Sequence, residues 1–300
     1  MDSPAIARRR VRLAVRDARL AKGDTQTDVA EAMEWSLSKV MRIESGEVTI
    51  SPNDLRPLLA YLGVRNRQVV DDLVQAAKES KSRRQWWDEP RFRESLTPAV
   101  RQLIQYEAEA TEARYFSVAV IPGRLQTDAY ARQILDNYSD VYSPEAVAVR
   151  VEARARRREQ LLSQREHPMI YLLLDESVLL RQIVSRRIMG EQLTALAKYS
   201  DEGWLVVRIA PFTKPAPLMG TFELLYLGAD DAQHAVMYRE SELQDELVDD
   251  QSLTTRHRLV FDRVWFSSVD EETSADLLHS RGQWFLEDEG NHPEDSGPRA

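Results

Sequence analysis

The sequence predicts two domains, an all-α domain followed by a mixed α+β domain. A chain of 300 residues is long enough for two domains of ordinary size. Apolar residues recur at helical spacing through the first 80 residues, whereas runs rich in Val, Leu, Phe and Tyr alternate with helical segments further along. The expected divisions are an all-α domain over 1–80, a linker or docking segment over 81–95, an α+β domain over 96–286 and a disordered acidic tail over 287–300.

Five helices are expected in the first domain. The first is predicted over 5–22, and a Pro at the first helical position favours the start of the fourth. Three of the helices are predicted to begin after a side chain that can cap them, the first with a capping-box carboxylate: Thr25 with Asp28, Ser36, and Ser51. Apolar residues at helical spacing are expected to face the core: Val11, Val15 and Ala18; Val29, Ala30 and Met33; Leu37, Val40 and Ile43; Leu55, Leu58, Leu59 and Leu62; Val69, Leu73 and Ala77.

The second domain is expected to mix helices and strands. Its helices are predicted over 98–115, 124–137, 144–164, 186–199, 249–267 and 271–285. Its strands are predicted over 169–174, 204–209, 220–227 and 234–238, and an apolar run over 115–121 ends at a Pro-Gly turn. Trp86 and Trp87, in the segment before this domain, could stack on nucleotides, although tryptophans after a linker are more often buried between domains.

Charge is distributed unevenly along the chain. The net charge is −9, yet residues 1–84 contain 16 Lys and Arg against 12 Asp and Glu, while residues 85–300 contain 24 against 37. A positive first domain in an acidic protein is compatible with a nucleic-acid partner for that domain. The chain has no cysteine, which excludes disulfides, thiolate nucleophiles and zinc sites with Cys ligands. Five scattered histidines indicate no other metal site, and we expect no cofactor.

The sequence gives no indication of a membrane. Its apolar runs are too short to cross one, and the arginines near the start are not followed by the apolar region of a signal peptide. We therefore expect a cytoplasmic protein.

Two neighbouring helices of the first domain resemble a known family. The runs TQTDVAEAM (25–33) and SLSKVMRIESG (36–46) resemble the xenobiotic-response-element family of helix-turn-helix regulators. The Thr-Gln pair, the Ala, the Ser cap, the Ile-Glu pair and the final Gly fall in the register of that family. Glu34 and Trp35 stand where the family usually has Gly-Val, so we expect a slightly altered turn within the same fold, because glycine is favoured where φ is positive.

The second of these helices presents side chains suited to DNA. Small hydroxyl groups and a cation lie in its first turn, with an arginine one turn further along the same side. The two cations could contact base edges or phosphates, and the resemblance implies that the first residues of the preceding helix contact phosphates or the first base. The candidate DNA-binding residues are Gln26, Thr27, Ser36, Ser38, Lys39 and Arg42. The alternative is a merely solvated polar face, and Glu44 is expected to pair with Arg16 or Arg19 inside the domain.

Three segments of the second domain, 120–130, 174–177 and 209–212, resemble a domain found behind this helix-turn-helix in actinobacterial regulators, and the similarity covers about residues 86–280. Those proteins are antitoxin-like transcription regulators, often encoded beside a small partner protein, so the resemblance implies partner binding. The alternative is a one-component sensor whose second domain binds a small molecule. Asp175 and Glu176 follow a predicted strand, where catalytic carboxylates can lie, but the chain has no glycine-rich phosphate loop or hydrolase motif, and we do not expect an enzyme.

Five arginines between residues 150 and 158 are a second candidate nucleic-acid surface: Arg150, Arg154, Arg156, Arg157 and Arg158. Because glutamates stand among them, an exposed or domain-docking face is the favoured interpretation. The sequence as a whole predicts a sequence-specific transcription regulator that binds double-stranded DNA, is expected to act as a homodimer, and has a second domain for a partner protein or a ligand.

Overall fold

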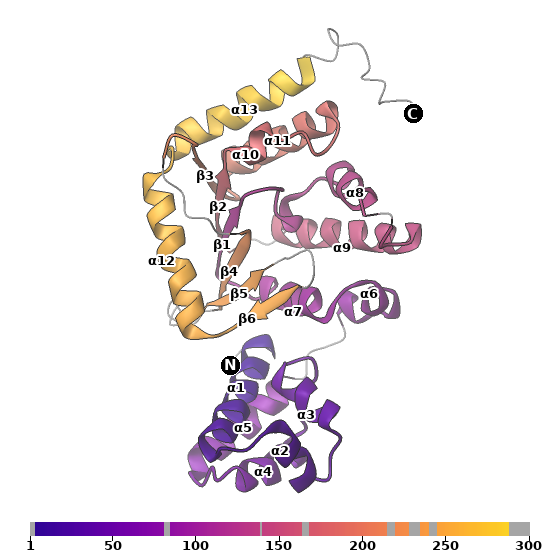
Figure 1. Cartoon of the computed structure of the whole chain (residues 1–300), viewed down its shortest axis with the longest axis vertical. Coiled ribbons are helices and arrows are strands. Elements are labelled where there is room, and N and C mark those ends of the chain that lie inside the picture. Colours follow the sequence, from indigo (N-terminus) through magenta and orange to yellow (C-terminus); the bar gives the residue numbers. More distant parts are fainter. Residues whose placement is uncertain are drawn as a thin grey trace. The chain divides into compact units, whose positions relative to one another are not determined.

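The structure is a computed structural model that describes residues 4–80, 85–138, 140–163, 168–214, 220–227, 235–239 and 245–287. The chain forms two compact units, Met1–Glu89 and Pro90–Ala300, each with its own hydrophobic core (Figure 1). The division between them lies within the stretch 81–95 that was predicted to be a linker or docking segment. The predicted acidic tail lies outside the described residues from 288 onward, and Glu287 is the last residue of a helix.

The first unit is all-α, as predicted. Its helices are α1 (Pro4–Lys22), α2 (Gln26–Ala32), α3 (Leu37–Glu44), α4 (Pro52–Tyr61) and α5 (Arg67–Glu79), and a short 3-10 turn, η1 (Trp86–Asp88), follows. Thr25, Ser36 and Ser51 cap α2, α3 and α4, each accepting a hydrogen bond from the backbone N–H three residues on. Side-chain oxygens thus satisfy backbone donors that the first turn of a helix leaves unpaired.

Two apolar residues expected in the core of this unit are exposed instead. Leu37 and Val69 each expose 42% of their surface, whereas the other members of the predicted apolar faces are buried or packed against the core. Each of the two lies in the first turn of its helix, and its side chain faces solvent, whereas the later members of the same predicted apolar face are buried. The assignment of Leu37 and Val69 to the core is therefore wrong.

The second unit is a mixed α+β domain. Its elements are α6 (Pro90–Ser95), α7 (Pro98–Glu107), β1 (Glu112–Ser117), η2 (Gly123–Leu125), α8 (Asp128–Asp136), α9 (Pro144–Ser163), β2 (Met169–Asp175), α10 (Ser177–Leu180), α11 (Arg186–Asp201), β3 (Val206–Ala210), β4 (Phe222–Tyr226), β5 (Val236–Arg239), β6 (Glu246–Val248), α12 (Gln251–Ser267) and α13 (Glu271–Glu287). The six strands form one sheet in the order β3-β2-β1-β4-β5-β6. The pairs β1–β2 and β2–β3 are parallel, and the other three pairs are antiparallel.

Several predicted boundaries differ from those of the structure. The helix predicted over 98–115 ends at Glu107, and β1 begins at Glu112 because residues there pair with both β2 and β4. The helix predicted over 124–137 begins only at Asp128, where Thr127 caps it. The helices α6 and α10 and the three-residue strand β6 were not predicted from the sequence.

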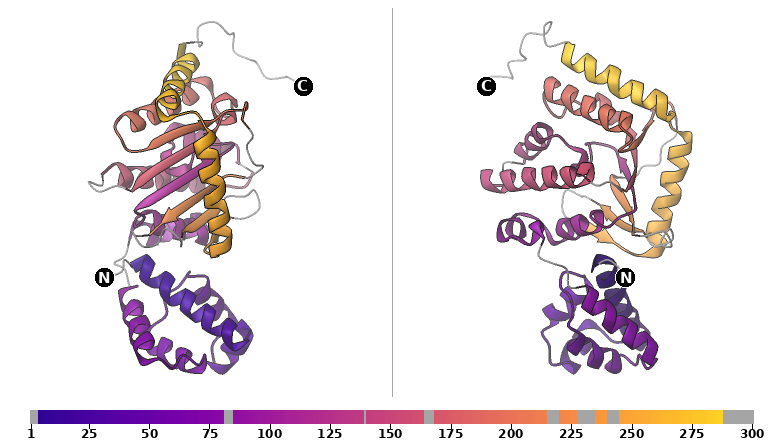
Figure 2. Two further views of the ribbon diagram at one scale, coloured as in Figure 1. Left: turned by 90° about the vertical axis from the view of Figure 1, so that its left-hand side faces the viewer. Right: turned by 180° about the vertical axis from the view of Figure 1, so that it is seen from behind.

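Helices cover both faces of the sheet. α12 crosses one face, while α7, α9 and α11 lie on the other (Figures 1 and 2). Phe261, Val264 and Trp265 of α12 pack against sheet residues, and an ion pair of 2.6 Å joins Asp262 to Arg114 of β1. α13 packs along α11. A Cβ atom at Gly190 of α11 would lie 3.0 Å from a backbone carbonyl of α13, so only glycine allows this approach.

A buried ion pair connects α7 to α9 on the second face. Glu107 accepts hydrogen bonds from Nε and Nη2 of Arg157 at 2.7 and 2.8 Å, and both side chains are buried. Burial alone would raise the pKa of Glu107, but the positive charges of Arg157 and Arg124 outweigh that effect and hold the pKa below its usual value. The pair is therefore ionised at neutral pH, and its contribution to stability is lost only as the pH falls below the usual range of a Glu carboxyl.

No helix among the described residues is long and apolar enough to cross a membrane.

Trp87 is buried, and its ring lies edge-on to that of the half-buried Trp86. Trp87 is therefore not accessible for the stacking on nucleotides that its position had suggested.

Replacing Glu107 with Gln should lower the free energy of unfolding of the second unit by about 3–5 kcal/mol, because Arg157 would keep a buried charge without its counter-charge. Urea unfolding, with hydrogen exchange of the β1 amides as the reporter for this unit, measures the change. Glu152→Gln is the matched control: Glu152 lies on α9, the helix of Arg157, and pairs with Arg91 and Arg156 at the surface. Its replacement should lower the free energy of unfolding by no more than about 1 kcal/mol. Equal stability of the two variants would contradict the role of the buried pair.

Candidate nucleic-acid interface

The pair α2 and α3 is held by local capping bonds at each helix start. The Thr25 hydroxyl accepts a hydrogen bond from the Asp28 N–H, and the Asp28 carboxylate accepts one of 2.7 Å from the Thr25 N–H. The Thr25 N–H and the Thr25 hydroxyl both donate hydrogen bonds to the Asp28 carboxylate, and these two bonds lower the pKa of Asp28. The Ser36 hydroxyl oxygen accepts a bond of 3.2 Å from the Lys39 N–H. Both predicted caps therefore form, and they fix where each helix begins.

The turn between the two helices contains a strained residue. Glu34 has φ of +54°, a left-handed conformation that the structure otherwise gives only to glycines among the described residues. Glycine adopts this region readily, whereas a residue with a Cβ atom pays about 1–2 kcal/mol. The turn thus keeps the backbone conformation for which the related family uses Gly, at a cost in stability.

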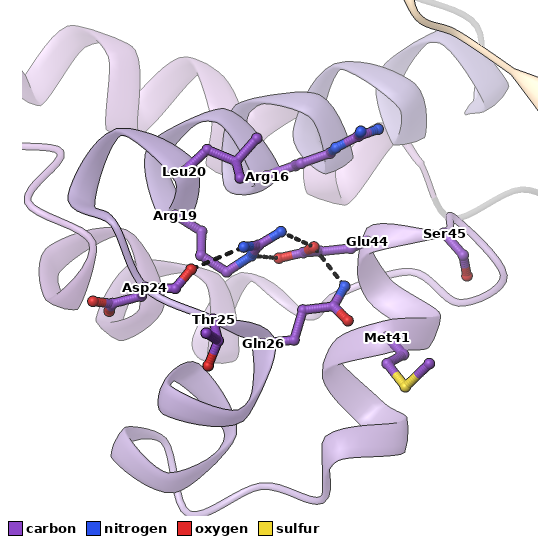
Figure 3. Close-up of a pocket in the computed structure, with 9 residues that line it drawn as sticks. All are labelled: Arg16, Arg19, Leu20, Asp24, Thr25, Gln26, Met41, Glu44 and Ser45. Carbon is purple, nitrogen blue, oxygen red and sulfur yellow. Dashed lines mark hydrogen bonds and ion pairs between the residues drawn. The ribbon is translucent and has the colours of Figure 1, made fainter.

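A buried ion pair fixes α3 against α1. Nε and Nη2 of Arg19 donate hydrogen bonds to the two carboxylate oxygens of Glu44 at 2.6 and 2.9 Å. The hydrogen bonds to Glu44 raise the pKa of Arg19. Gln26, the first residue of α2, donates a third hydrogen bond of 2.8 Å to Glu44, so the carboxylate joins three helices (Figure 3). The expected pairing of Glu44 inside the domain is confirmed, with Arg19 as the partner.

An open groove lies beside this ion pair. It has a volume of about 740 Å³ and is bordered by α1, the start of α2 and the outer side of α3 (Figure 3). Its lining mixes charged, polar and apolar side chains: Arg16, Arg19, Leu20, Asp24, Thr25, Gln26, Met41, Glu44 and Ser45. The groove therefore combines cationic and apolar surface on the same side of the unit as the start of α2.

Four of the six candidate DNA-binding residues have side chains turned toward solvent. Thr27, Ser36, Ser38 and Arg42 are exposed, whereas Gln26 is half-buried and bound to Glu44. Ser36 also serves as the cap, so its hydroxyl has a structural role. These positions remain predictions as DNA contacts.

The two cations of α3 already have acidic neighbours. Lys39 lies 3.2 Å from a carboxylate oxygen of Asp54, and its ammonium sits 3.7 Å from the centre of the Trp35 ring. Nε of Arg42 lies 3.4 Å from a carboxylate oxygen of Glu47, and about half of the Arg42 side chain is exposed. Both pairs are open to solvent and weak, but only Lys39 is also held over an aromatic ring.

Two exposed residues of α3 were not predicted as DNA contacts. Met41 exposes 50% of its surface and Leu37 exposes 42%, and neither was considered a DNA contact. Because Ser36 was predicted as the cap, the start of the helix was known, and the outward position of Leu37 and Met41 could have been predicted from it. Once the helix start is fixed, the buried residues Val40, Ile43 and Glu44 define its inner side and leave positions 37, 38, 41 and 42 outside.

The arginines between residues 150 and 158 do not form an exposed surface. None of the five arginines is exposed, so an exposed face, one of the two alternatives in the favoured interpretation, is wrong. Arg157 is buried against Glu107, Arg158 donates to the Gln126 carbonyl and pairs with Asp128, and Arg154 lies close to Gly123. Their charges serve contacts within the second unit, because α9 lies between other helices and the sheet.

The two carboxylates at the end of β2, Asp175 and Glu176, also accept hydrogen bonds from nearby backbone groups. Asp175 accepts a hydrogen bond of 2.9 Å from the Ser177 N–H, and Glu176 accepts one of 2.7 Å from the Phe212 N–H. A cavity of about 400 Å³ opens beside Glu176 at the carboxyl ends of the parallel strands β2 and β3. Its wall is mainly apolar and includes Leu180 and Trp284, with Arg281 as a cation. No cluster of metal-ligating side chains occurs among the described residues.

Two family models match the chain. One is described as a helix-turn-helix domain and matches residues 11–73, and the other is described as a domain of unknown function (DUF5753) and matches residues 100–280. No curated protein and no solved structure matches the chain. The first unit is thus a DNA-binding helix-turn-helix domain, with α2 and α3 as its helix pair.

Replacing Glu34 with Gly should stabilise the first unit by about 1 kcal/mol and raise its Tm by a few degrees, because glycine removes the strain of the left-handed conformation. The greater freedom of glycine in the unfolded chain opposes part of the gain. Thermal unfolding measures the effect. Glu34→Ala is the control, since it removes the same charge but keeps a Cβ atom, and equal stabilisation by Ala and Gly would show that charge rather than backbone strain is responsible.

Proposed function

The chain belongs to the family defined by the domain of unknown function DUF5753, and we propose that it is a cytoplasmic, antitoxin-like transcription regulator that binds operator DNA as a homodimer. The helix-turn-helix domain would read the DNA, and the second domain would bind a small partner protein. The observation that carries the first part is the α2–α3 pair, whose inner side is fixed by Arg19, Glu44 and Gln26 while its outer side is exposed.

The two cations of α3 are assigned different roles in this proposal. Arg42 is the better candidate for a base edge, because its exposed guanidinium has a fork of donors that matches the two acceptors of guanine. Lys39 is held by Asp54 and Trp35, so we assign it a phosphate contact at the edge of the groove. Thr27 and Gln26 are proposed to contact phosphates at the start of α2.

A partner-binding role for the second domain is supported by the outer face of α12. Leu259 and Phe266 expose 53% and 79% of their surfaces, and Leu253, nearer the start of the same helix, exposes 39%. Arg256 and Arg263 are exposed on the same face, at the helical spacing that places them between the apolar residues. A helix with exposed apolar and basic side chains fits a partner with an apolar strip and acidic groups.

The second candidate function, a small-molecule sensor, is favoured by the cavity beside Glu176. Its volume of about 400 Å³ lies in the range of ligand sites, and it opens at the carboxyl ends of parallel strands. Arg281 lies 4.2 Å from the centre of the Trp284 ring, so a flat ligand with an acidic group would find both a ring and a cation there. A compound that raises the Tm of the wild type but not of Trp284→Ala would favour this function over partner binding.

Replacing Arg42 with Ala should cost about 1–3 kcal/mol per half-site on the preferred sequence and relax the preference at one base pair. Replacing Lys39 with Ala should weaken binding to all sequences about equally and reduce the salt slope by about one. Selection from random duplexes, followed by titrations at several salt concentrations, measures both effects.

Arg67→Ala is the control for these titrations. Its side chain is 95% exposed on α5, so the variant loses the same charge away from α2 and α3. A wild-type protein that binds all duplexes alike would contradict sequence-specific binding, and an Arg42→Ala variant with unchanged preference would remove Arg42 from the reading residues.

The double variant Leu259→Ser and Phe266→Ser should lose the partner protein that copurifies with the tagged wild type from its native host, while its affinity for DNA stays the same. Removing two apolar contacts from the middle of an interface is expected to lower affinity strongly. Val141→Ser, at an exposed apolar residue of a loop in the same domain, should keep the partner. If both variants keep it, α12 is not the docking surface.

A further inference from the structure

The exposed side of α3 consists of two parallel stripes of different chemistry. Leu37 and Met41 are four residues apart and form an apolar stripe, and Ser38 and Arg42 form a polar stripe beside it. Residues four apart lie one above the other on a helix, so each stripe runs along the helix axis. The polar stripe was expected from the sequence, whereas the apolar stripe was not.

The apolar stripe is not part of the core of the unit. Leu37 and Met41 expose 42% and 50% of their surfaces, while Val40 and Ile43 of the same helix expose 3% and 4%. Met41 also borders the groove beside the Arg19–Glu44 pair, where it points away from the ion pair (Figure 3). Because the buried residues of α3 already fill the contact with the other helices, the stripe is available to something outside the first unit.

The major groove of DNA contains one apolar group that such a stripe could recognise. Each base pair presents a pattern of donors and acceptors there, and thymine adds its C5-methyl group, which cytosine and uracil lack. Apolar side chains recognise thymine by contact with that methyl group, without any hydrogen bond. Serine and arginine on the polar stripe offer donors for the neighbouring bases.

We propose that Leu37 and Met41 are specificity-determining residues that read the C5-methyl groups of thymines in the operator. The inference rests on the proposed DNA-binding function, and it extends that function by naming a base. A half-site would then contain one or two thymines beside the base that Arg42 contacts. Both residues act through contact and burial of methyl groups.

A second copy of the chain is a less suitable occupant of the stripe. A stable protein interface buries about 800 Å² on each partner, far more than two side chains supply. Arg42 also lies beside the stripe on α3, and the Arg42 cations of two copies would repel each other across a symmetric contact. The same cations attract the phosphates that flank a major groove.

Replacement of thymine by deoxyuridine tests the proposal directly. Selection from random DNA first identifies the duplex that the full-length protein prefers. Each thymine of that duplex is then replaced in turn by deoxyuridine. The replacement removes one methyl group and leaves base pairing unchanged. Wild-type affinity should fall about fourfold at one or two thymines, the loss expected from one buried methyl group.

The same duplexes are titrated with Leu37→Ala and Met41→Ala. For the position that its missing side chain reads, each variant should bind the thymine duplex and the uracil duplex with equal affinity. At the other position, replacement of thymine by uracil should still lower the affinity of that variant. Replacing that uracil by 5-bromouracil, whose bromine is close to a methyl group in size, should restore wild-type affinity. Val69→Ala is the matched control, because Val69 is equally exposed on α5 and should leave every uracil effect unchanged.

The possible failures can be told apart. A wild-type protein without sequence preference would overturn the proposed function and this inference with it. A wild-type protein that prefers a sequence but is insensitive to uracil at every position would overturn the inference alone, as would uracil effects that persist in both variants. Dissociation of a wild-type dimer by either variant, measured by sedimentation with the uracil effects retained, would assign the stripe to contact between copies instead.

Discussion

The position of α3 depends on one buried interaction, the ion pair between Arg19 and Glu44. Its two hydrogen bonds of 2.6 and 2.9 Å join the end of α1 to the end of α3, and Gln26 brings the start of α2 to the same carboxylate. A buried carboxylate without a partner would be costly, so the three helices are constrained to meet at this point. The caps at Thr25 and Ser36 fix where the helices start, and the ion pair fixes how they lie together. The outer side of α3 is thereby presented on a rigid base.

Ion pairs between elements also hold the second unit together. Glu107 and Arg157 tie two helices together on one face of the sheet, and Arg114 and Asp262 tie α12 to the other. In each case a charged side chain that faces the core has a partner of opposite charge, as burial requires. This use of charge accounts for part of the arginine-rich stretch of α9, which looks like a nucleic-acid surface in the sequence, because Arg157 and Arg158 pair with carboxylates of the same unit. The apolar residues Phe266 and Leu259 of α12 remain exposed outside these contacts.

Local signals in the sequence predicted much of the first unit and less of the second. The caps Thr25, Ser36 and Ser51 could be predicted because a side chain and a backbone group three residues apart decide them. Leu37 was misassigned because residues 37, 40 and 43 recur every third position, and a helix of about 3.6 residues per turn rotates such a series steadily away from one face. The start of β1 depends on pairing with distant strands, which no local pattern reports, and β6 has only three residues, too few to show a strand pattern. Among the candidate site residues, the pattern identified the exposed polar side chains but not the bond between Gln26 and Glu44, because α1 supplies the other half of that contact.

The separation between the inner and outer sides of α3 has a consequence for how such a protein diverges. Leu37, Ser38, Met41 and Arg42 contribute little to the core, so substitutions at these four positions after a gene duplication would be nearly neutral for folding. Two copies could then acquire different target sites in few mutational steps, without passing through an unfolded intermediate. Arg19, Gln26 and Glu44, by contrast, form one network and can change only together. Selection would therefore act on the two sides of one short helix at very different rates.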